Sequence, residues 1–140
     1  MGKTIALVAC SGKKIDTKGK SVRADKLYDG AFFKASMDYI RRHPVDETFI
    51  LSAYYGLLRP DDYIETYDKY LGNMKSEEIK KWSDDIIYEL RRNGCDLDND
   101  IFVFFAGKDY YEDIVRSGLI NNYDIPLEGL RYGEKLHALK

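Results

Sequence analysis

The sequence predicts an α/β fold, in which residues 1–140 form a single domain with a mostly parallel sheet of about four strands flanked by helices. Two observations support this prediction. Short apolar runs without polar alternation, typical of strands buried on both faces, alternate along the chain with segments of helical periodicity. In addition, 140 residues with 44% hydrophobic content suffice for one core without disulfides or a structural metal. The alternation implies right-handed crossovers between parallel strands.

Three runs are expected to be the strands of this sheet. They are residues 4–10 (TIALVAC), 48–53 (TFILSA) and 101–106 (IFVFFA). A weaker fourth strand is expected at residues 122–126. Two longer segments, residues 11–29 and 56–75, are expected to be irregular loops, and ordered loops of that length in small domains often carry function.

Helices are predicted between these strands. Residues 31–42 have apolar residues at helical offsets, and the following His43-Pro44 pair ends the helix because a residue before proline disfavours the α region. Residues 76–93 form the clearest helix, with Ser76 as its N-cap and Gly94 after its end. Its buried stripe consists of Ile79, Trp82, Ile86 and Leu90. A third helix is expected at residues 108–117.

Composition excludes several function classes. A net charge of −2 excludes the wholesale basic surface of a non-specific nucleic-acid coat protein, although a local basic loop remains compatible with it. No apolar run approaches the ~20 residues that cross a bilayer, and the first apolar stretch is too brief for a secretion signal. We therefore expect a cytoplasmic protein with no membrane partner.

Metal and cofactor sites are not indicated. Cys10 and Cys95 are 85 positions apart and fit no zinc-ligand spacing, so they are expected to be reduced thiols. His43 and His137 form no metal-binding motif with them. The sequence therefore predicts no metal site and no cofactor.

A ligand site is expected at the carboxyl ends of the predicted strands, where ligands bind in open parallel sheets. Each of the three strong strands is followed at once by a turn of small residues, which contain Gly12, Gly56 and Gly107 respectively. Small residues allow a ligand to approach the backbone closely. Three such turns at one edge would form the floor of one site.

The first of these turns has the composition of an anion cradle. Ser11, Gly12, Lys13 and Lys14 offer backbone N–H groups, a hydroxyl group and two cations. The turn is not a Walker A loop, because Leu7 stands where that motif needs glycine and Lys14 where it needs Ser or Thr. A solvated basic turn is the alternative interpretation. Cys10, just before it, is either a nucleophile activated by the lysines or a small apolar residue, and we favour the second.

Tyrosines and carboxylates alternate in the second loop. Tyr54, Tyr55 and Tyr67 have the rings and hydroxyl groups that suit stacking on a nucleobase and hydrogen bonding to its polar edge. Asp68 and Glu65 are acid–base candidates in that loop, and Glu128 is a further one from the far end of the sheet. Of these carboxylates, we assign the catalytic role to Asp68 and Glu128.

Short motifs follow one another along nearly the whole chain, at residues 9–14 (ACSGKK), 27–33 (LYDGAFF), 50–58 (ILSAYYGLL), 67–68 (YD), 106–111 (AGKDYY) and 126–130 (PLEGL). As a set they resemble small bacterial and phage proteins of a family of unknown function, whose pattern reads roughly S-C-G-K-x-K, L-Y-x-G-x-x-F, L-S-A-x-Y-G-L, Y-D and P-L-x-G-L. This chain has Cys10-Ser11-Gly12 where the pattern has Ser-Cys-Gly, which weakens a nucleophilic role for the thiol.

The resemblance implies an α/β fold and a shared site built from these loops, to which Tyr28, Ser52 and Tyr110 would also belong. More distantly, the layout is similar to α/β domains of nucleobase-modifying and base-excising proteins, including the peroxide-stress protein group and the archaeosine-synthesis enzymes. Fold similarity alone does not determine function.

Two functions are compatible with these features. The first is an enzyme that acts on a nucleoside, a nucleotide or a DNA base, at or near the N-glycosidic bond, with a phosphate-containing small molecule or a nucleic-acid base as its partner. The alternative is a non-catalytic module, such as a nucleotide sensor or a phage interaction protein, that binds phosphate or nucleotide in the same cleft.

Overall fold

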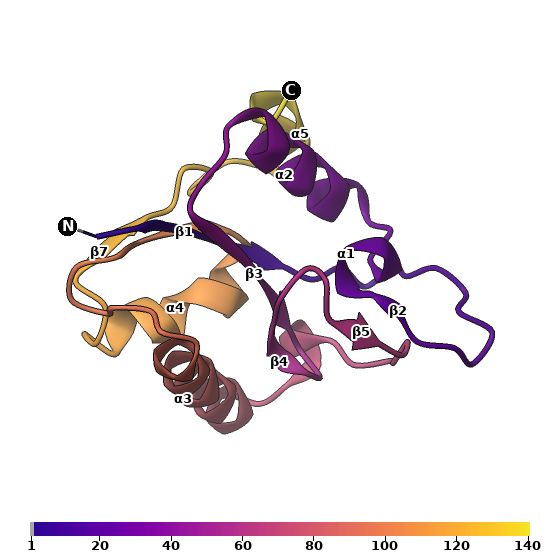
Figure 1. The fold of residues 1–140 in the computed structure, drawn as a ribbon, viewed down its shortest axis with the longest axis horizontal. Helices are drawn as coiled ribbons and strands as arrows, with labels where there is room; N and C mark the ends of the chain where they lie inside the picture. The colour runs from indigo at the N-terminus through magenta and orange to yellow at the C-terminus, as the bar shows by residue number, and fades with distance from the viewer. Residues whose placement is uncertain (1) are drawn as a thin grey trace.

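A five-stranded sheet lies at the centre of the computed structural model, which describes residues 2–140 (Figure 1). Its strand order is β4-β3-β1-β6-β7. The strands β1 (Thr4–Ala9), β3 (Glu47–Ser52), β6 (Ile101–Phe105) and β7 (Asn122–Asp124) are parallel to one another. These are the four strands that the sequence predicts, so the expected α/β domain with a mostly parallel sheet is confirmed.

The fifth strand is an addition to the prediction. β4 (Gly56–Leu58) turns back directly after β3 and pairs with it in antiparallel fashion, with Ser52 opposite Gly56. The expectation that residues 56–75 are irregular from their first residue is therefore wrong. A three-residue edge strand is too short to show a period of its own.

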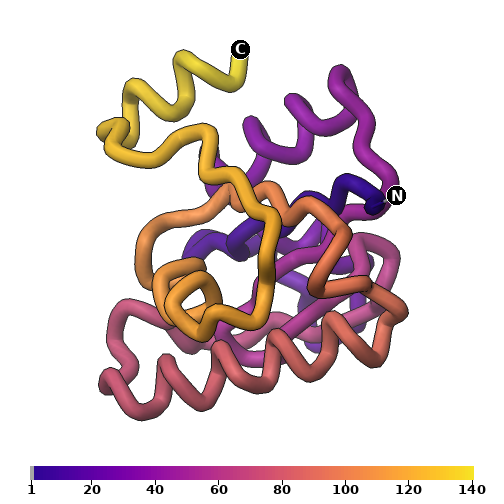
Figure 2. Tube along the Cα trace, turned by 90° about the vertical axis from the view of Figure 1, so that its left-hand side faces the viewer, coloured from indigo at the N-terminus to yellow at the C-terminus, as the bar shows by residue number. Residues whose placement is uncertain are grey.

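Helices cover both faces of the sheet. α2 (Ala31–Arg42) and α5 (Tyr132–Ala138) lie over one face, and α3 (Ser76–Arg92) and α4 (Lys108–Arg116) lie over the other (Figures 1 and 2). Along β1, Ile5 and Leu7 are buried on the α3–α4 side, and Ala6 and Val8 on the α2 side. Burial on both faces explains why β1 reads as a continuous apolar run.

Two helix termini differ from the prediction. The N-cap of α3 is Lys75 instead of Ser76, because the Glu78 carboxylate accepts the Lys75 N–H at 3.0 Å. α5 was not predicted, since among its own residues none is buried. It begins in the same manner, where the Glu134 carboxylate accepts the Arg131 N–H at 2.8 Å. An apolar stripe is the main sequence signal for a helix, and α5 lacks one.

The two long loops contain short elements that pair with each other. Residues 11–29 include β2 (Val22–Arg23) and α1 (Ala24–Leu27), and residues 56–75 include β5 (Tyr63–Ile64) and a 3-10 turn (Leu71–Asn73). β2 and β5 form a two-stranded antiparallel ribbon, with Val22 opposite Ile64 and Arg23 opposite Tyr63. The prediction that these segments are irregular throughout is wrong. Two-residue strands have no periodicity that a sequence could reveal.

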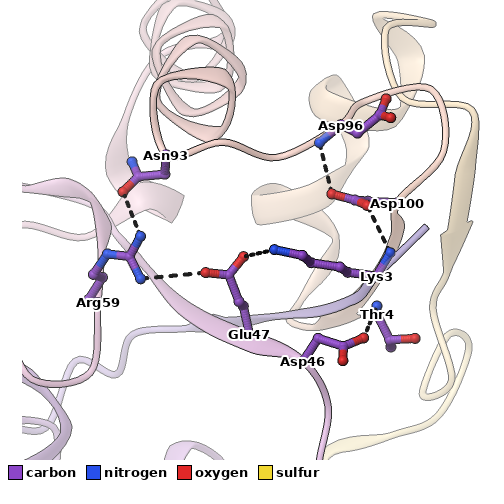
Figure 3. Close-up of polar contacts among 8 residues, drawn as sticks. All are labelled: Lys3, Thr4, Asp46, Glu47, Arg59, Asn93, Asp96 and Asp100. Atoms are coloured by element: carbon purple, nitrogen blue, oxygen red, sulfur yellow. Dashed lines mark hydrogen bonds and ion pairs between the residues drawn. The ribbon is translucent and has the colours of Figure 1, made fainter. Parts of the chain in front are cut away.

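Ion pairs and carboxylate hydrogen bonds close the edge of the sheet where the central strands begin (Figure 3). Asp100, only 4% exposed, accepts the N–H groups of Lys3 and Asp96, each at 2.8 Å. Asp46 accepts the Thr4 N–H at 2.7 Å. Lys3 and Arg59 approach the Glu47 carboxylate at 4.0 and 3.6 Å. We call this set, Lys3, Thr4, Asp46, Glu47, Arg59, Asn93, Asp96 and Asp100, the amino-edge cluster.

Candidate functional site

The sheet has a topological switch point at the carboxyl ends of the neighbouring strands β1 and β6, because the connections that follow these strands lead to opposite edges of the sheet. The connection after β1 passes over one face to β3, and the connection after β6 passes over the other face through α4 to β7. Ligands of open α/β sheets bind at such switch points. Here Cys10, just after β1, and Tyr110, on α4, meet with 3.3 Å between Sγ and Oη.

Three hydroxyl groups form a hydrogen-bonded chain at the end of β3. The Tyr67 Oη lies 2.7 Å from the Tyr28 Oη and 2.9 Å from the Ser52 Oγ. The same Oγ accepts the N–H groups of Tyr54 and Tyr55, at 3.3 and 3.0 Å. These two contacts occupy the oxygen of Ser52 as an acceptor, so its hydrogen is available to Tyr67.

Lys14 brings a cation to these tyrosines. Its Nζ lies 4.3 Å from the centroid of the Tyr67 ring and 5.6 Å from that of Tyr70, and it donates to the Gly12 carbonyl at 3.3 Å. Burial lowers the pKa of Lys14, while the charges of Cys10 and Asp68 act in the opposite direction. The ammonium group is therefore partly desolvated and lies over an aromatic face. We call Cys10, Lys14, Tyr28, Ser52, Tyr67 and Tyr110 the carboxyl-edge cluster.

The phenols of this cluster remain protonated at neutral pH. Burial raises the pKa of Tyr28 to about 12, and it also raises the pKa of Tyr67 and of Tyr110. Tyr28 is 2% exposed. As neutral phenols the three groups can donate and accept hydrogen bonds, but because they stay protonated they cannot act as general bases near pH 7.

The predicted anion cradle is divided between two environments. The Ser11 hydroxyl accepts the Gly30 N–H at 3.1 Å and donates to the Lys13 carbonyl at 2.6 Å, so it fixes the turn against the start of α2. Lys13 is exposed and lies 3.9 Å from the Asp29 carboxylate. Of the two lysines, Lys14 is the one that contacts the tyrosine rings.

Gly12 permits a close contact within the site. A Cβ at this position would lie 2.6 Å from the Cε1 of Tyr70, so any other residue would displace that ring. Tyr70 was not among the predicted site residues, because its exposed position in a tyrosine-rich loop has no distinguishing pattern. The approach of its ring to Lys14 depends on the absence of a side chain at Gly12.

Gly56, Gly107 and Tyr55 shape the surroundings of the cluster. Gly56 pairs with Ser52 at the start of β4. Gly107 is the N-cap of α4, the helix that carries Tyr110. The Tyr55 hydroxyl donates to the Glu65 carbonyl at 3.0 Å, which holds the β3–β4 turn against the segment leading to Tyr67. These three predicted residues therefore position the site from the two neighbouring turns.

The two predicted catalytic carboxylates lie in different places. Asp68 is exposed and borders, with Tyr70, a surface hollow of about 390 Å³, and its charge favours the protonated form of Lys14. Glu128 is exposed in the segment between β7 and α5, and the group whose pKa it helps to raise, after burial, is Tyr111. Within residues 2–140, no hydrogen bond or ion pair joins Glu128 to the carboxyl-edge cluster.

Trp82 is a positioning residue that the sequence indicates only as part of the core. Its Nε1 donates to the Ser52 carbonyl at 2.9 Å, and its ring packs edge-on against Tyr110 at 5.6 Å between centroids. A buried tryptophan usually needs an acceptor for its N–H group. That requirement could have indicated a polar partner for Trp82, although not which one.

Two further properties concern the described residues as a whole. Within residues 2–140, no group of three or more His, Cys, Asp or Glu side chains is arranged so that it could hold a metal ion. In the same range, no helix combines the length and the apolar character needed to cross a membrane.

Comparison with known proteins places the chain in a family. A protein of Colwellia psychrerythraea, named UPF0246 protein, is 31% identical over 75 residues, which cover 50% of this chain and 29% of that relative. The match thus spans less than a third of the relative's length. The model of a family of unknown function, DUF6884, matches residues 5–140. The expectation of a family of unknown function is confirmed, and the chain belongs to the DUF6884 family.

Proposed function

We propose that this protein is an enzyme that acts on a nucleotide, a nucleoside or a nucleic-acid base, at or near the N-glycosidic bond. The observation that carries this proposal is the position of Lys14. Its ammonium group lies over the Tyr67 ring, while the hydroxyl of the same tyrosine is hydrogen-bonded to Tyr28 and Ser52. A cation, an aromatic face and neutral hydroxyl groups thus meet at the carboxyl edge of the sheet, which also contains its switch point.

These groups match the chemistry of a nucleotide. Aromatic rings stack on a base, neutral hydroxyl groups pair with its polar edge, and an ammonium group binds phosphate as a point charge. The rings of Tyr54 and Tyr67 stack on each other at 5.2 Å and 24°, and Tyr54 is 59% exposed. The aromatic surface therefore continues from Lys14 to solvent, which gives a planar ligand a face to stack on.

Asp68 is the better placed of the two proposed catalytic carboxylates. It directly follows Tyr67 and its charge acts on Lys14. In the proposed reaction it activates water or stabilises the positive charge that develops on the sugar as the glycosidic bond breaks. Glu128 is the second candidate and lacks a contact with the carboxyl-edge cluster among the residues described.

A non-catalytic binding module is the second candidate function. The observation that favours it is the make-up of the carboxyl-edge cluster, which contains phenols, a hydroxyl, a thiol and an amine but no carboxylate. A nucleotide sensor would need only recognition, which these groups supply without Asp68 or Glu128.

The two lysines of the first turn provide a matched test. We expect Lys14→Met to weaken the binding of a nucleoside monophosphate by roughly tenfold or more, because a charge-assisted contact is lost while the aliphatic stem is kept. Lys13→Met should change it by less than about threefold, since Lys13 is exposed and paired with Asp29. Isothermal titration calorimetry with the monophosphate and with its nucleoside measures both effects.

One result would contradict the proposed role of Lys14, and a second measurement distinguishes the enzyme from the sensor. If Lys14→Met weakens the nucleoside as much as the monophosphate, Lys14 is not a phosphate ligand. Turnover separates enzyme from sensor: incubation with nucleosides, nucleotides and DNA, followed by mass detection of free base, yields product only for an enzyme. If the wild-type protein releases free base, Asp68→Asn should abolish that release and leave ligand affinity nearly unchanged.

A further inference from the structure

The loop between β1 and β2 extends beyond the rest of the molecule and ends in a hydrogen-bonded turn (Figure 1). At its tip the Lys20 N–H donates to the Thr17 carbonyl at 3.0 Å, and both residues between them, Lys18 and Gly19, have positive φ, 52° and 77°. These are the features of a type I′ turn. The turn therefore presents Lys18 and Lys20 at its tip in a defined geometry.

This loop and the two short elements that follow it, β2 and α1, carry a concentration of positive charge. Residues 13–26 contain six cations, Lys13, Lys14, Lys18, Lys20, Arg23 and Lys26, and two carboxylates, Asp16 and Asp25, in a chain whose net charge is −2. A local excess of this size on an acidic protein produces a positive potential confined to one projection. The partner of this projection should therefore be an anion.

Part of this charge is not neutralised by neighbouring groups. The Asp16 carboxylate accepts the Lys18 N–H at 2.9 Å, and Asp25 pairs with Arg23 at 3.0 Å. Within residues 2–140, Lys18, Lys20 and Lys26 form no ion pair. Their ammonium groups are thus available to phosphate groups outside the protein.

The adjoining ribbon adds aromatic surface. Directly opposite residues of an antiparallel pair project on the same face. In the β2–β5 ribbon the pair Val22 and Ile64 faces the core, and the pair Arg23 and Tyr63 faces solvent, with Tyr63 69% exposed. A guanidinium group and a phenol ring therefore stand side by side on the outer face.

The ribbon connects the projecting loop to the carboxyl-edge cluster. The Ala24 and Asp25 N–H groups donate to the carbonyls of Asp62 and Pro60, at 2.7 and 3.0 Å, which joins the two segments. Lys14 lies near the start of the loop, and β5 leads within three residues to Tyr67. A chain-like ligand lying along the loop and the ribbon would therefore reach the site where Lys14 and Tyr67 meet.

We infer that the loop of residues 13–23 and the outer face of the β2–β5 ribbon bind single-stranded nucleic acid, and that this strand is the form in which the substrate reaches the site. This inference rests on the proposed function and specifies its substrate class. Lys18 and Lys20, which form no ion pair within residues 2–140, contact phosphates, and Tyr63 stacks on a base, which is the combination that single-strand binding proteins use. A duplex keeps its bases stacked on each other and cannot offer a face to Tyr63.

The test replaces the two lysines at the tip of the loop with neutral residues, and a control variant loses the same number of positive charges elsewhere in the protein. The full-length protein and the variant Lys18→Gln/Lys20→Gln are titrated against a fluorescently labelled twelve-nucleotide oligothymidylate, and binding is followed by anisotropy between about 50 and 200 mM salt. We expect roughly tenfold weaker binding for the variant, and a slope of log K against log salt reduced by about 1.4. The control variant Arg91→Gln/Lys140→Gln removes two exposed cations away from this loop and should bind as the wild type does.

Further measurements separate this inference from the proposed function. Lys18→Gln/Lys20→Gln should leave the affinity for a nucleoside monophosphate unchanged, and Tyr63→Ala should weaken the oligonucleotide about fivefold or more through the loss of one stacked base. Equal oligonucleotide binding by wild type and loop variant overturns the inference, as does duplex bound as tightly as single strand. Loop-dependent binding to phosphatidylserine vesicles without binding to oligonucleotide also overturns it. None of these results bears on the binding of a nucleoside monophosphate through Lys14, so the proposed function would stand. Only a failure of the wild-type protein to bind the monophosphate through Lys14 would reject the proposed function.

Discussion

The two ends of β1, β3 and β6 differ in their polar groups. At the amino ends, carboxylates accept backbone N–H groups and pair with cations (Figure 3). At the carboxyl ends, neutral hydroxyl groups, a thiol and one ammonium group contact one another. In the amino-edge cluster, Asp100 binds two N–H groups of the main chain. In the carboxyl-edge cluster, Tyr67 binds two side-chain hydroxyl groups.

This difference separates stability from binding. A carboxylate that joins backbone groups far apart in the chain closes the fold, and its loss leaves buried donors without partners. In the carboxyl-edge cluster the hydroxyl groups bond to one another, and a hydroxyl group can both donate and accept, so each can pair with more than one partner. We therefore expect substitutions at the amino edge to lower the free energy of unfolding and substitutions at the carboxyl edge to lower ligand affinity.

The largest effect on stability is expected for Asp100→Ala. This change removes the acceptor of the Lys3 and Asp96 N–H groups at a position that is 4% exposed, so we expect the free energy of unfolding to fall by about 3 kcal/mol. Urea denaturation followed through the fluorescence of Trp82, the single tryptophan, measures the change.

Asp84→Ala is the matched control for that experiment. Its carboxylate is exposed and pairs with Lys80 at 3.5 Å, so its removal should cost less than about 0.5 kcal/mol. A loss below about 1 kcal/mol for Asp100→Ala, or a drop in the nucleotide affinity of the folded variant, would remove the distinction between the two edges.

Alkaline pH should lower the stability through Cys95, which the charges of the amino-edge residues Glu47 and Asp100 affect, and through the buried phenols of the carboxyl-edge cluster. Burial, followed by the charges of Glu47 and Asp100, raises the pKa of Cys95 from 9.0 to about 11, and burial raises the pKa of Tyr28 from 10.0 to about 12. Between pH 9 and about 11 for Cys95, and between pH 10 and about 12 for Tyr28, the group has lost its proton in the unfolded chain but retains it in the native protein. The unfolded state then binds fewer protons, so stability falls as pH rises from about 9 to 12, by on the order of 2 kcal/mol per group.

Single substitutions resolve the two contributions. Cys95→Ala should flatten the stability profile between about pH 9 and 10, where unfolded tyrosines are still mostly protonated. Tyr28→Phe should reduce its slope only at higher pH, where Tyr67 and Tyr110 still contribute. Urea titrations at pH 8, 9.5 and 11 give the profiles. Identical profiles for both variants and the wild type would show that neither group is protonated preferentially in the native state.

The fold could be predicted where one strand or helix produces its own pattern. Buried runs such as residues 4–10 and the long amphipathic α3 contain enough residues to show it. The ribbon of β2 and β5 escaped prediction because each strand has two residues and depends on a partner about forty positions away. Segments of this kind are defined by tertiary contacts and not by local periodicity.

The candidate site could be located from the sequence but not assembled. Small residues after each strand point to the carboxyl edge of the sheet, and Lys14, Tyr67 and Tyr110 lie at that edge. The roles within the first turn could not be foreseen, because Lys13 and Lys14 are adjacent and chemically identical. One faces Asp29 and the other faces Tyr67 only because Lys14 pairs with Tyr28 in an isolated bridge. Such a choice depends on the backbone path, which no motif specifies.

A smaller effect on stability than that of Asp100→Ala, and the sharpest test of the carboxyl edge, is expected for Tyr67→Phe. The substitution keeps the ring under Lys14 and removes the hydroxyl that joins Tyr28 to Ser52. Since those two hydroxyl groups can bond to each other, the free energy of unfolding should fall by only about 1 kcal/mol. The affinity for a nucleoside should fall by roughly tenfold, because the base loses a neutral donor.

The same variant distinguishes the hydroxyl from the cation. The ratio of monophosphate to nucleoside affinity should remain at the wild-type value for Tyr67→Phe, whereas Lys14→Met should lower that ratio. Calorimetric titrations of both ligands against both variants give the four affinities needed. A stability loss for Tyr67→Phe as large as that of Asp100→Ala, with ligand affinity unchanged, would mean that the carboxyl-edge cluster closes the fold just as the amino-edge cluster does, because its hydroxyl groups would then be committed to one another and not available to a ligand.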